Sequence, residues 1–249
     1  MIRAGLCSVT FRQLTAEQIV DAAARAQLDV IEWGGDVHVP PGDTARAVEV
    51  ARVTADAGLA VCSYGSYFRA SAGEDLTPIL DSAEALGADR IRIWAGSLGS
   101  ADASAQDWGR TVDRIQDAVA AASTRGIALA LEFHSGTLAD TAPTTLRLLA
   151  DVDSSALTTY WQPTVAAPDD VALDEYATLS AHVSAAHVFS WWPVKERLPL
   201  HARDGLWRRF FEAAAAADHR PRDALLEFIP GADPDLLAAE AATLRSYLV

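Results

Sequence analysis

The feature that most restricts the fold of this chain is a strict alternation of two kinds of segment. Short apolar runs of strand length alternate with longer runs whose apolar residues recur at helical spacing. Eight such units follow one another, without a linker, a low-complexity tract or a change of composition. The predicted strands lie at 2–8, 28–33, 59–64, 90–95, a run starting at 127, 157–162, 183–190 and 223–228.

The helical segments carry their own start and stop signals. Thr15 and Gln18 have the spacing of a capping box, and Gly58, Gly87 and Gly126 each stand where a helix should end. The predicted helices lie at 15–27, 44–57, 74–86, 104–125, a helix opening near Pro143, 170–182, 205–217 and one beginning after Asp233-Pro234. The strongest helical pattern is that of 104–125.

Eight alternating units in 249 residues have the size and order of a (β/α)8 TIM barrel, with residues 1–249 as a single domain. A doubly wound open sheet is the alternative architecture. It more often carries a glycine-rich phosphate loop after its first strand, and the segment from Leu6 to Thr10 is not one. We therefore expect the barrel.

Charge and composition restrict the partners. The formal charge of −14 argues against nucleic acid, and no apolar run is long enough to cross a membrane. Cys7 and Cys62 lie in apolar, strand-like runs, which predicts buried, reduced thiols, and the N-terminus resembles no signal peptide. We expect a cytoplasmic protein with a small-molecule partner; whether it forms a homo-oligomer is open.

Polar residues end four consecutive predicted strands. Glu132, Gln162, His187 and Glu227 each stand at or near the end of an apolar run, and Leu-Glu-Phe occurs on both the fifth and the eighth strand. The carboxyl ends of all strands of a TIM barrel meet around one mouth, where active sites lie. We therefore expect these four side chains to converge.

Two glutamates in a partly dry mouth repel each other, and a divalent cation would relieve that repulsion. Two glutamate oxygens, one amide oxygen and one imidazole nitrogen favour Mn, Mg or Co over Zn, and the lack of thiolates disfavours a structural zinc site. The alternative is that the four residues simply bond to one another.

Aromatic residues gather at the strand ends. Five of the seven tryptophans lie there or in the following loops: Trp33, Trp94, Trp161, Trp191 and Trp192. Such rings suit the C–H faces of a sugar or an aryl group, although some of them must serve packing. His134 shares a strand side with Glu132, so it either contacts substrate or is hydrogen-bonded structurally.

With these residues the chain resembles the xylose isomerase-like TIM barrels, the sugar phosphate isomerase/epimerase superfamily that also includes the endonuclease IV type of AP endonuclease. In that superfamily Glu, Asp, His and Glu from strands five to eight hold a divalent metal. The resemblance is specific at Glu132, His187, Glu227 and Glu32, and it implies that Glu32 contacts substrate. It implies acid and base roles for Glu132 and Glu227, and Arg197 as the nearest match to a substrate-contacting arginine after strand seven.

The chain departs from that pattern on strand six. Gln162-Pro-Thr-Val165 stands where Asp-x-x-His is common, so one negative charge and one substrate-contacting histidine are missing. The departure implies weaker metal binding, a different ion or no ion. Known ketose epimerase substrates are therefore not transferred to this chain.

The leading hypothesis is a metal-dependent isomerase or epimerase acting on a sugar or polyol derivative through an enediolate. A dehydratase or lyase shares the first half of that reaction. A metal-free barrel with a binding or regulatory role is the third alternative. A DNA repair nuclease is disfavoured by the acidic charge and by the few histidines.

Overall fold

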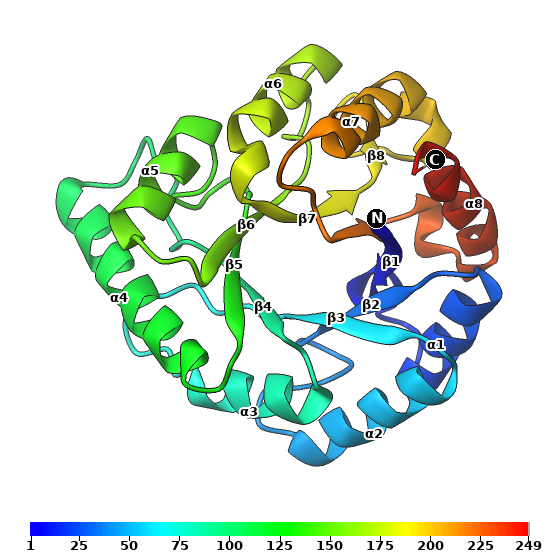
Figure 1. Ribbon diagram of the computed structural model, residues 1–249, viewed down its shortest axis with the longest axis horizontal. Helices are drawn as coiled ribbons and strands as arrows, with labels where there is room; N and C mark the ends of the chain where they lie inside the picture. The colour runs from blue at the N-terminus through cyan, green and yellow to red at the C-terminus, as the bar shows by residue number, and fades with distance from the viewer. Residues whose placement is uncertain (249) are drawn as a thin grey trace.

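A closed barrel of eight parallel strands forms the centre of the molecule, which we describe from a computed structural model covering residues 1–248. The strands follow the order β1-β10-β7-β6-β5-β4-β3-β2, and helices surround them on the outside (Figure 1). The barrel strands are β1 (Arg3–Cys7), β2 (Val30–Gly34), β3 (Ala60–Gly65), β4 (Arg90–Ile93), β5 (Ala128–Glu132), β6 (Leu157–Trp161), β7 (Val183–Val188) and β10 (Asp223–Leu226). The predicted single TIM barrel fold is confirmed.

Eight α-helices alternate with these strands among residues 1–248. They are α1 (Ala16–Arg25), α2 (Thr44–Asp56), α3 (Thr77–Leu86), α4 (Ala105–Ser123), α5 (Ala142–Val152), α6 (Asp169–Leu179), α7 (Asp204–Ala216) and α8 (Leu237–Tyr247). Short 3-10 turns are η1 (Ser8–Phe11), η2 (Ser180–His182), η3 (Leu200–Arg203), η4 (Pro230–Ala232) and η5 (Pro234–Leu236). No helix within 1–248 is both long and apolar enough to cross a membrane.

The local signals of the sequence act as expected at most helix ends. Thr15 and Gln18 form the capping box of α1, and Gly87 ends α3 with a φ of +75°, a conformation that costs a glycine little. Helix α3 begins three residues later than predicted. The carboxylate of Glu74 accepts hydrogen bonds from the backbone N–H groups of Arg69 and Ser71 and thereby closes the preceding loop.

A hairpin that the sequence pattern did not reveal lies after β7. Strand β8 (Ser190–Trp191) pairs antiparallel with β9 (Arg197–Leu198). Both strands have only two residues, so no periodicity signals them. The hairpin brings Arg197 back beside the barrel strand ends.

Apolar side chains form two separate cores. The larger one lies between the strands and the helices, where Trp161 stacks on Phe210 with ring centroids 4.7 Å apart. The smaller one lies inside the barrel and includes Cys7, Cys62, Tyr160 and small residues such as Ala130. Because these interior side chains are small, two arginines of β4 also fit inside the barrel.

Candidate active site

The four side chains predicted to converge lie together at the barrel mouth. Three of them surround one ring nitrogen of the fourth, His187. The Nδ1 atom of His187, on β7, lies 3.0 Å from Oε1 of Gln162, 3.5 Å from Oε2 of Glu227 and 3.8 Å from Oε1 of Glu132. These residues come from the ends of β5, β6 and β10. Strand alternation and barrel closure together bring them to the same mouth.

Each of the three oxygen donors lies at a distance from His187 Nδ1 that two ligands of one divalent ion can have. Metal bonds to oxygen and nitrogen of about 2.0–2.2 Å place neighbouring donors about 3–4 Å apart. The distances of 3.0, 3.5 and 3.8 Å from Nδ1 fall in this range. Three oxygens and one imidazole nitrogen form a donor set suited to Mg, Mn or Co.

An arginine that sequence reasoning missed lies in the middle of the site. Arg92 of β4 is 3% exposed, donates from Nε to Oε1 of Glu32 at 3.1 Å, and also pairs with Oε2 of Glu132. Gly65 makes room for this pair, since a Cβ there would lie 2.9 Å from both Arg92 Nη2 and Glu32 Oε1. Arg92 therefore compensates part of the glutamate charge for which the sequence predicted a metal ion alone.

A signal for Arg92 was present in the sequence. The strand Arg90-Ile-Arg92-Ile alternates arginine with isoleucine, so both arginines share one side of the strand. In a barrel that side is either the interior or the helix layer. Ala128 and Ala130 of β5 pair with Arg90 and Arg92. Because both alanine side chains are small, they leave room for the two arginine side chains inside the barrel.

Burial and neighbouring charges act in opposite directions on the ionisable groups. Burial raises the pKa of Glu227 to about 7, with Glu132 adding to the rise and His187 opposing it. Burial alone would lower the pKa of His187, but Glu227 and Glu32 raise it overall. Burial disfavours ionisation of Glu32 as well, yet Arg92, His187 and Ser63 together outweigh burial and lower the pKa of that carboxyl. The site thus separates its carboxyl groups by environment.

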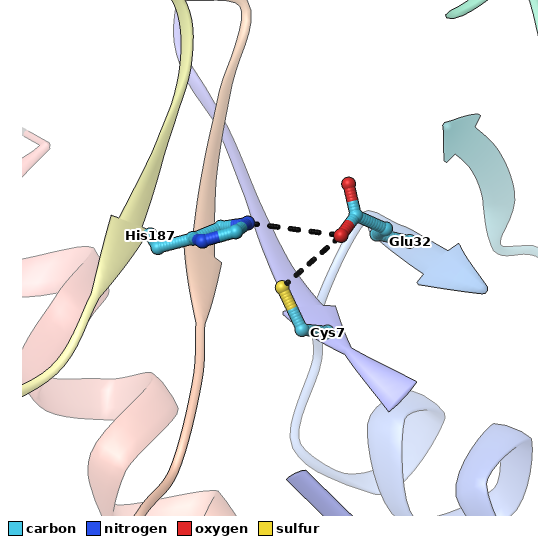
Figure 2. A group of neighbouring side chains, drawn as sticks. All are labelled: Cys7, Glu32 and His187. Carbon is cyan, nitrogen blue, oxygen red and sulfur yellow. Dashed lines mark hydrogen bonds and ion pairs between the residues drawn. The ribbon is translucent and has the colours of Figure 1, made fainter. Parts of the chain in front are cut away.

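The other nitrogen of His187 points toward a second group of side chains (Figure 2). His187 Nε2 lies 3.7 Å from Glu32 Oε1, and Cys7 Sγ lies 3.8 Å from the same oxygen. The hydroxyl of Ser63 donates to the other Glu32 oxygen at 2.8 Å. Burial, followed by the charge of Glu32, raises the pKa of the Cys7 thiol.

A cavity of about 280 Å³ opens above the four converging residues, and Arg92, Glu132, Gln162 and Glu227 lie on its wall. Two of the predicted substrate-binding residues, Trp94 and His134, also line it, stacked on each other with centroids 4.4 Å apart. Trp191 lines another part of the wall and packs on Phe228 at 5.2 Å. The cavity therefore has aromatic walls and a polar floor.

Three predicted substrate contacts lie outside the cavity. Trp33 and Trp161 are fully buried in the layer between strands and helices. Each directly neighbours an inward-facing position, so strand alternation turns it outward. Glu32 faces inward but lies behind Arg92 and is 2% exposed, away from the cavity wall. None of the three lines the cavity, and their contact with substrate stays a prediction.

Two other residues lie at the rim. Trp192 is 39% exposed and lies against Arg203, whose guanidinium is 5.2 Å from the ring. Arg197 lies on β9 with its guanidinium 4.8 Å above the ring of Phe228 and 5.8 Å from that of Trp191. Arg197 thus stands beside the aromatic wall, within the region where the sequence predicted it.

A polar cluster at the opposite rim was also missed. Arg12 donates to Asp36 at 2.5 Å and to the hydroxyl of Tyr67 at 2.7 Å, and both Arg12 and Tyr67 line the cavity. Arg12 follows η1, after the first strand, in a segment with no distinctive pattern. Only the fold brings it next to Tyr67.

Comparison with known proteins identifies relatives of this barrel. A 3-dehydroshikimate dehydratase from Bacillus anthracis is 29% identical over 161 residues, which are 59% of this chain and 57% of that protein. The matched region therefore spans just over half the length of this relative. The match supports a proposal about activity but does not establish one.

Solved structures of the same fold cover nearly the whole chain. The probable 3-DHS dehydratase AsbF from Bacillus anthracis superposes with a TM-score of 0.80 at 22% identity, covering 98% of this chain and 99% of that one. D-psicose 3-epimerase from Clostridium cellulolyticum H10 has a TM-score of 0.73 at 15% identity, with 99% of each chain covered. A xylose isomerase-like TIM barrel protein from Mycobacterium smegmatis, solved in complex with magnesium, has a TM-score of 0.69 at 16% identity, covering 100% and 98%.

A model of the xylose isomerase-like TIM barrel family matches residues 20–246. The matched range contains all four residues that meet at the barrel mouth. The chain therefore belongs to the xylose isomerase-like TIM barrel family.

Proposed function

We propose that this protein is a divalent-metal-dependent dehydratase that removes water from a hydroxylated ketone. The observation that carries the proposal is the convergence of Glu132, Gln162 and Glu227 on the Nδ1 atom of His187. The resemblance to a 3-dehydroshikimate dehydratase, at 29% identity, favours dehydration over other outcomes of the same first step. The proposed substrate class is thus a small ring ketone with hydroxyl groups and a carboxylate.

Glu132, Gln162, His187 and Glu227 would hold the ion, with Mn, Mg or Co favoured over Zn because three of the four donors are oxygens. The magnesium complex of a protein with this fold supports a hard divalent cation. When bound, such an ion polarises a carbonyl oxygen and makes the neighbouring C–H more acidic.

The two glutamates have different roles in this proposal. Glu132, ion-paired with Arg92, accepts the proton from the carbon next to the carbonyl. Glu227, whose Oε2 lies 3.5 Å from His187 Nδ1, donates a proton to the departing hydroxyl. One C–H and one C–O bond break, a C=C bond forms, and the hydroxyl leaves as water. Exchange with solvent then returns each glutamate to its starting state.

The cavity supplies binding groups for such a substrate. Trp94 and Trp191 offer aromatic faces to a ring, and His134, stacked on Trp94, offers a polar edge beside them. Arg197, held over Phe228, provides a guanidinium that suits a substrate carboxylate at the rim. Aromatic walls with guanidinium groups beside them fit a ring acid better than a long open chain.

The direct test is to incubate purified protein with 3-dehydroshikimate and Mn²⁺ or Mg²⁺. Loss of water from that hydroxylated ring ketone leads to an aromatic ring, which ultraviolet absorbance detects. We expect metal-dependent turnover that EDTA abolishes and Glu227→Gln lowers. Metal-loaded, folded protein that produces no aromatic product would exclude this substrate.

Epimerisation or isomerisation of a ketose is the second candidate. Its supporting observation is that Glu132 Oε1 and Glu227 Oε2 both lie within 3.8 Å of one nitrogen, so one glutamate can remove a proton and the other return it. Incubation with ketoses in D₂O tests this candidate. Deuterium incorporation without loss of water would favour it over the dehydratase, and a metal-free protein unaffected by chelators would favour a binding role.

A further inference from the structure

The inner face of His187 carries a second set of potential metal donors, distinct from the four at the mouth. Cys7 Sγ, Glu32 Oε1 and His187 Nε2 all lie within 4.8 Å of one another, and all three residues are buried. They come from β1, β2 and β7, and they point toward a common space (Figure 2). None of the three atoms belongs to the donor set around Nδ1.

An independent observation points to a ligand in this space. His187 is 0% exposed, and its Nε2 has no hydrogen-bond partner among the residues that the structure describes. A buried polar atom without a partner costs free energy, so such atoms are rare unless they bind something. The atom faces the Glu32 oxygen at 3.7 Å, too far for a good hydrogen bond.

The donors define the kind of ion. We propose that Cys7, Glu32 and His187 Nε2 form a second cation site, selective for a thiophilic divalent ion such as Zn²⁺ or Cd²⁺. One sulfur, one oxygen and one imidazole nitrogen are typical ligands for such ions, whereas Mg²⁺ and Mn²⁺ prefer oxygen-rich sites. Cys7 binds as the thiolate, and its proton is released to solvent. Arg92, which shares Glu32 Oε1, disfavours a cation here, so the thiolate charge is needed for binding.

The two sites compete because they share one imidazole. An ion on Nε2 leaves the ring proton on Nδ1, which then donates to Gln162 Oε1 at 3.0 Å. An ion on Nδ1 leaves the proton on Nε2, directed at Glu32. A thiophilic ion therefore locks the tautomer that cannot serve the mouth site, and it acts as an antagonist of Mg²⁺ or Mn²⁺.

Titration with Cd²⁺ tests this site without any assay of catalysis. A cadmium–thiolate bond has an ultraviolet charge-transfer band, so wild-type protein should develop one equivalent of that band. Cys7→Ser should abolish the band, and Cys7→Ala serves as a second variant if the serine protein does not fold. Cys62→Ser is the matched control, since Cys62 is equally buried inside the barrel and lies 3.5 Å from Ser63 Oγ. This control should keep the full band.

A Glu132→Gln variant separates this proposal from the function of the mouth. Glu132 lies 3.8 Å from His187 Nδ1 and is not one of the three donors of the second site, so the variant should weaken Mn²⁺ binding while the cadmium band remains. Prebound Cd²⁺ should weaken Mn²⁺ binding in wild-type protein. The proposal of a second site is wrong if the band persists in a variant without Cys7, or if folded wild-type protein shows no band in excess Cd²⁺. Both outcomes are independent of metal binding and turnover at the mouth site.

Discussion

The barrel interior has two charged layers, one above the other, and each is built on an arginine of β4. In the lower layer Arg90 donates to Tyr160 at 2.9 Å and to Asp223 at 2.6 Å, and Arg3 also pairs with Asp223 at 2.7 Å. In the upper layer Arg92 faces Glu32 and Glu132, with Glu227 close to His187. The lower layer has one aspartate between two arginines, while the upper one has three glutamates around one arginine and one imidazole.

This difference predicts that the lower layer contributes to stability and the upper layer to function. In the lower layer the one buried carboxylate already has guanidinium partners and needs no cation, and removing Arg90 leaves Asp223 and Tyr160 without a buried partner. An excess of carboxylates at the mouth instead creates a place for a divalent cation. We therefore expect changes in the lower layer to affect unfolding and changes in the upper layer to affect metal binding and turnover.

The largest expected effect is on turnover. Glu132→Gln and Glu227→Gln each keep an oxygen near the ion but lose the ability to transfer a proton at neutral pH. Each should lower the rate by roughly 10²- to 10⁴-fold, as is usual for loss of a general acid or base. The measurement is steady-state turnover of the substrate that proves active, with unfolding curves to confirm intact folds. A variant with nearly full turnover would remove that glutamate from the proposed mechanism.

The next largest effect is expected on the free energy of unfolding, in variants of Arg90 and Arg92. Arg90→Met should lower the free energy of unfolding by about 3–5 kcal/mol, because Tyr160 and Asp223 lose a buried partner. Arg92→Met should destabilise the metal-free protein similarly, but Mn²⁺ should restore part of the loss by compensating Glu132. Urea unfolding with and without Mn²⁺ measures both. An equal response of the two variants to metal would contradict the division into layers.

Chelation should produce a smaller change in stability. A metal that binds only the folded state adds about 2.7 kcal/mol when present at 100 times its Kd. EDTA should therefore lower the Tm of the metal-loaded protein, and Glu227→Gln should reduce the shift. An unchanged melting curve of a protein shown beforehand to contain metal would indicate that the ion does not bind the native site.

Gln162 provides a finer test of the mouth. Gln162→Asp adds a charged oxygen and should tighten Mn²⁺ binding, whereas Gln162→Leu should weaken it by roughly tenfold or more. Calorimetric titration of the two variants beside the wild type gives the affinities. If both changes spare metal affinity but lower turnover, Gln162 binds substrate and is not a ligand.

The smallest expected effect is a dependence of metal affinity on pH. Burial raises the pKa of Glu227 to about 7, and neighbouring glutamates raise the pKa of His187, so protons compete with the metal near neutrality. Raising the pH through about 7 removes these protons and should tighten Mn²⁺ binding. Glu227→Gln should flatten the profile, and an equally steep profile in that variant would assign the titration to another group.

Much of the candidate site was predictable because it depends on local rules. An apolar run that ends in Glu132, Gln162, His187 or Glu227 places each side chain at a strand's carboxyl end, and the alternation of eight units predicts that those ends meet. Trp33 and Trp161 show where that reasoning fails. Both stand at strand ends, yet each directly neighbours a residue whose side chain faces inward, Glu32 or Gln162, so strand alternation turns the tryptophan toward the helices.

The sequence by itself determined the order of the elements, their caps and the chemistry at the strand ends, since all of these follow from periodicity within about twenty residues. The tertiary structure alone decided that Arg92 lies between Glu32 and Glu132, and that Cys7 stands near His187. These contacts join residues 40 to 180 positions apart in the printed sequence. The approach of Cys7 to His187 depends on the pairing of β1 with β10, which closes the barrel and has no local signal in either strand.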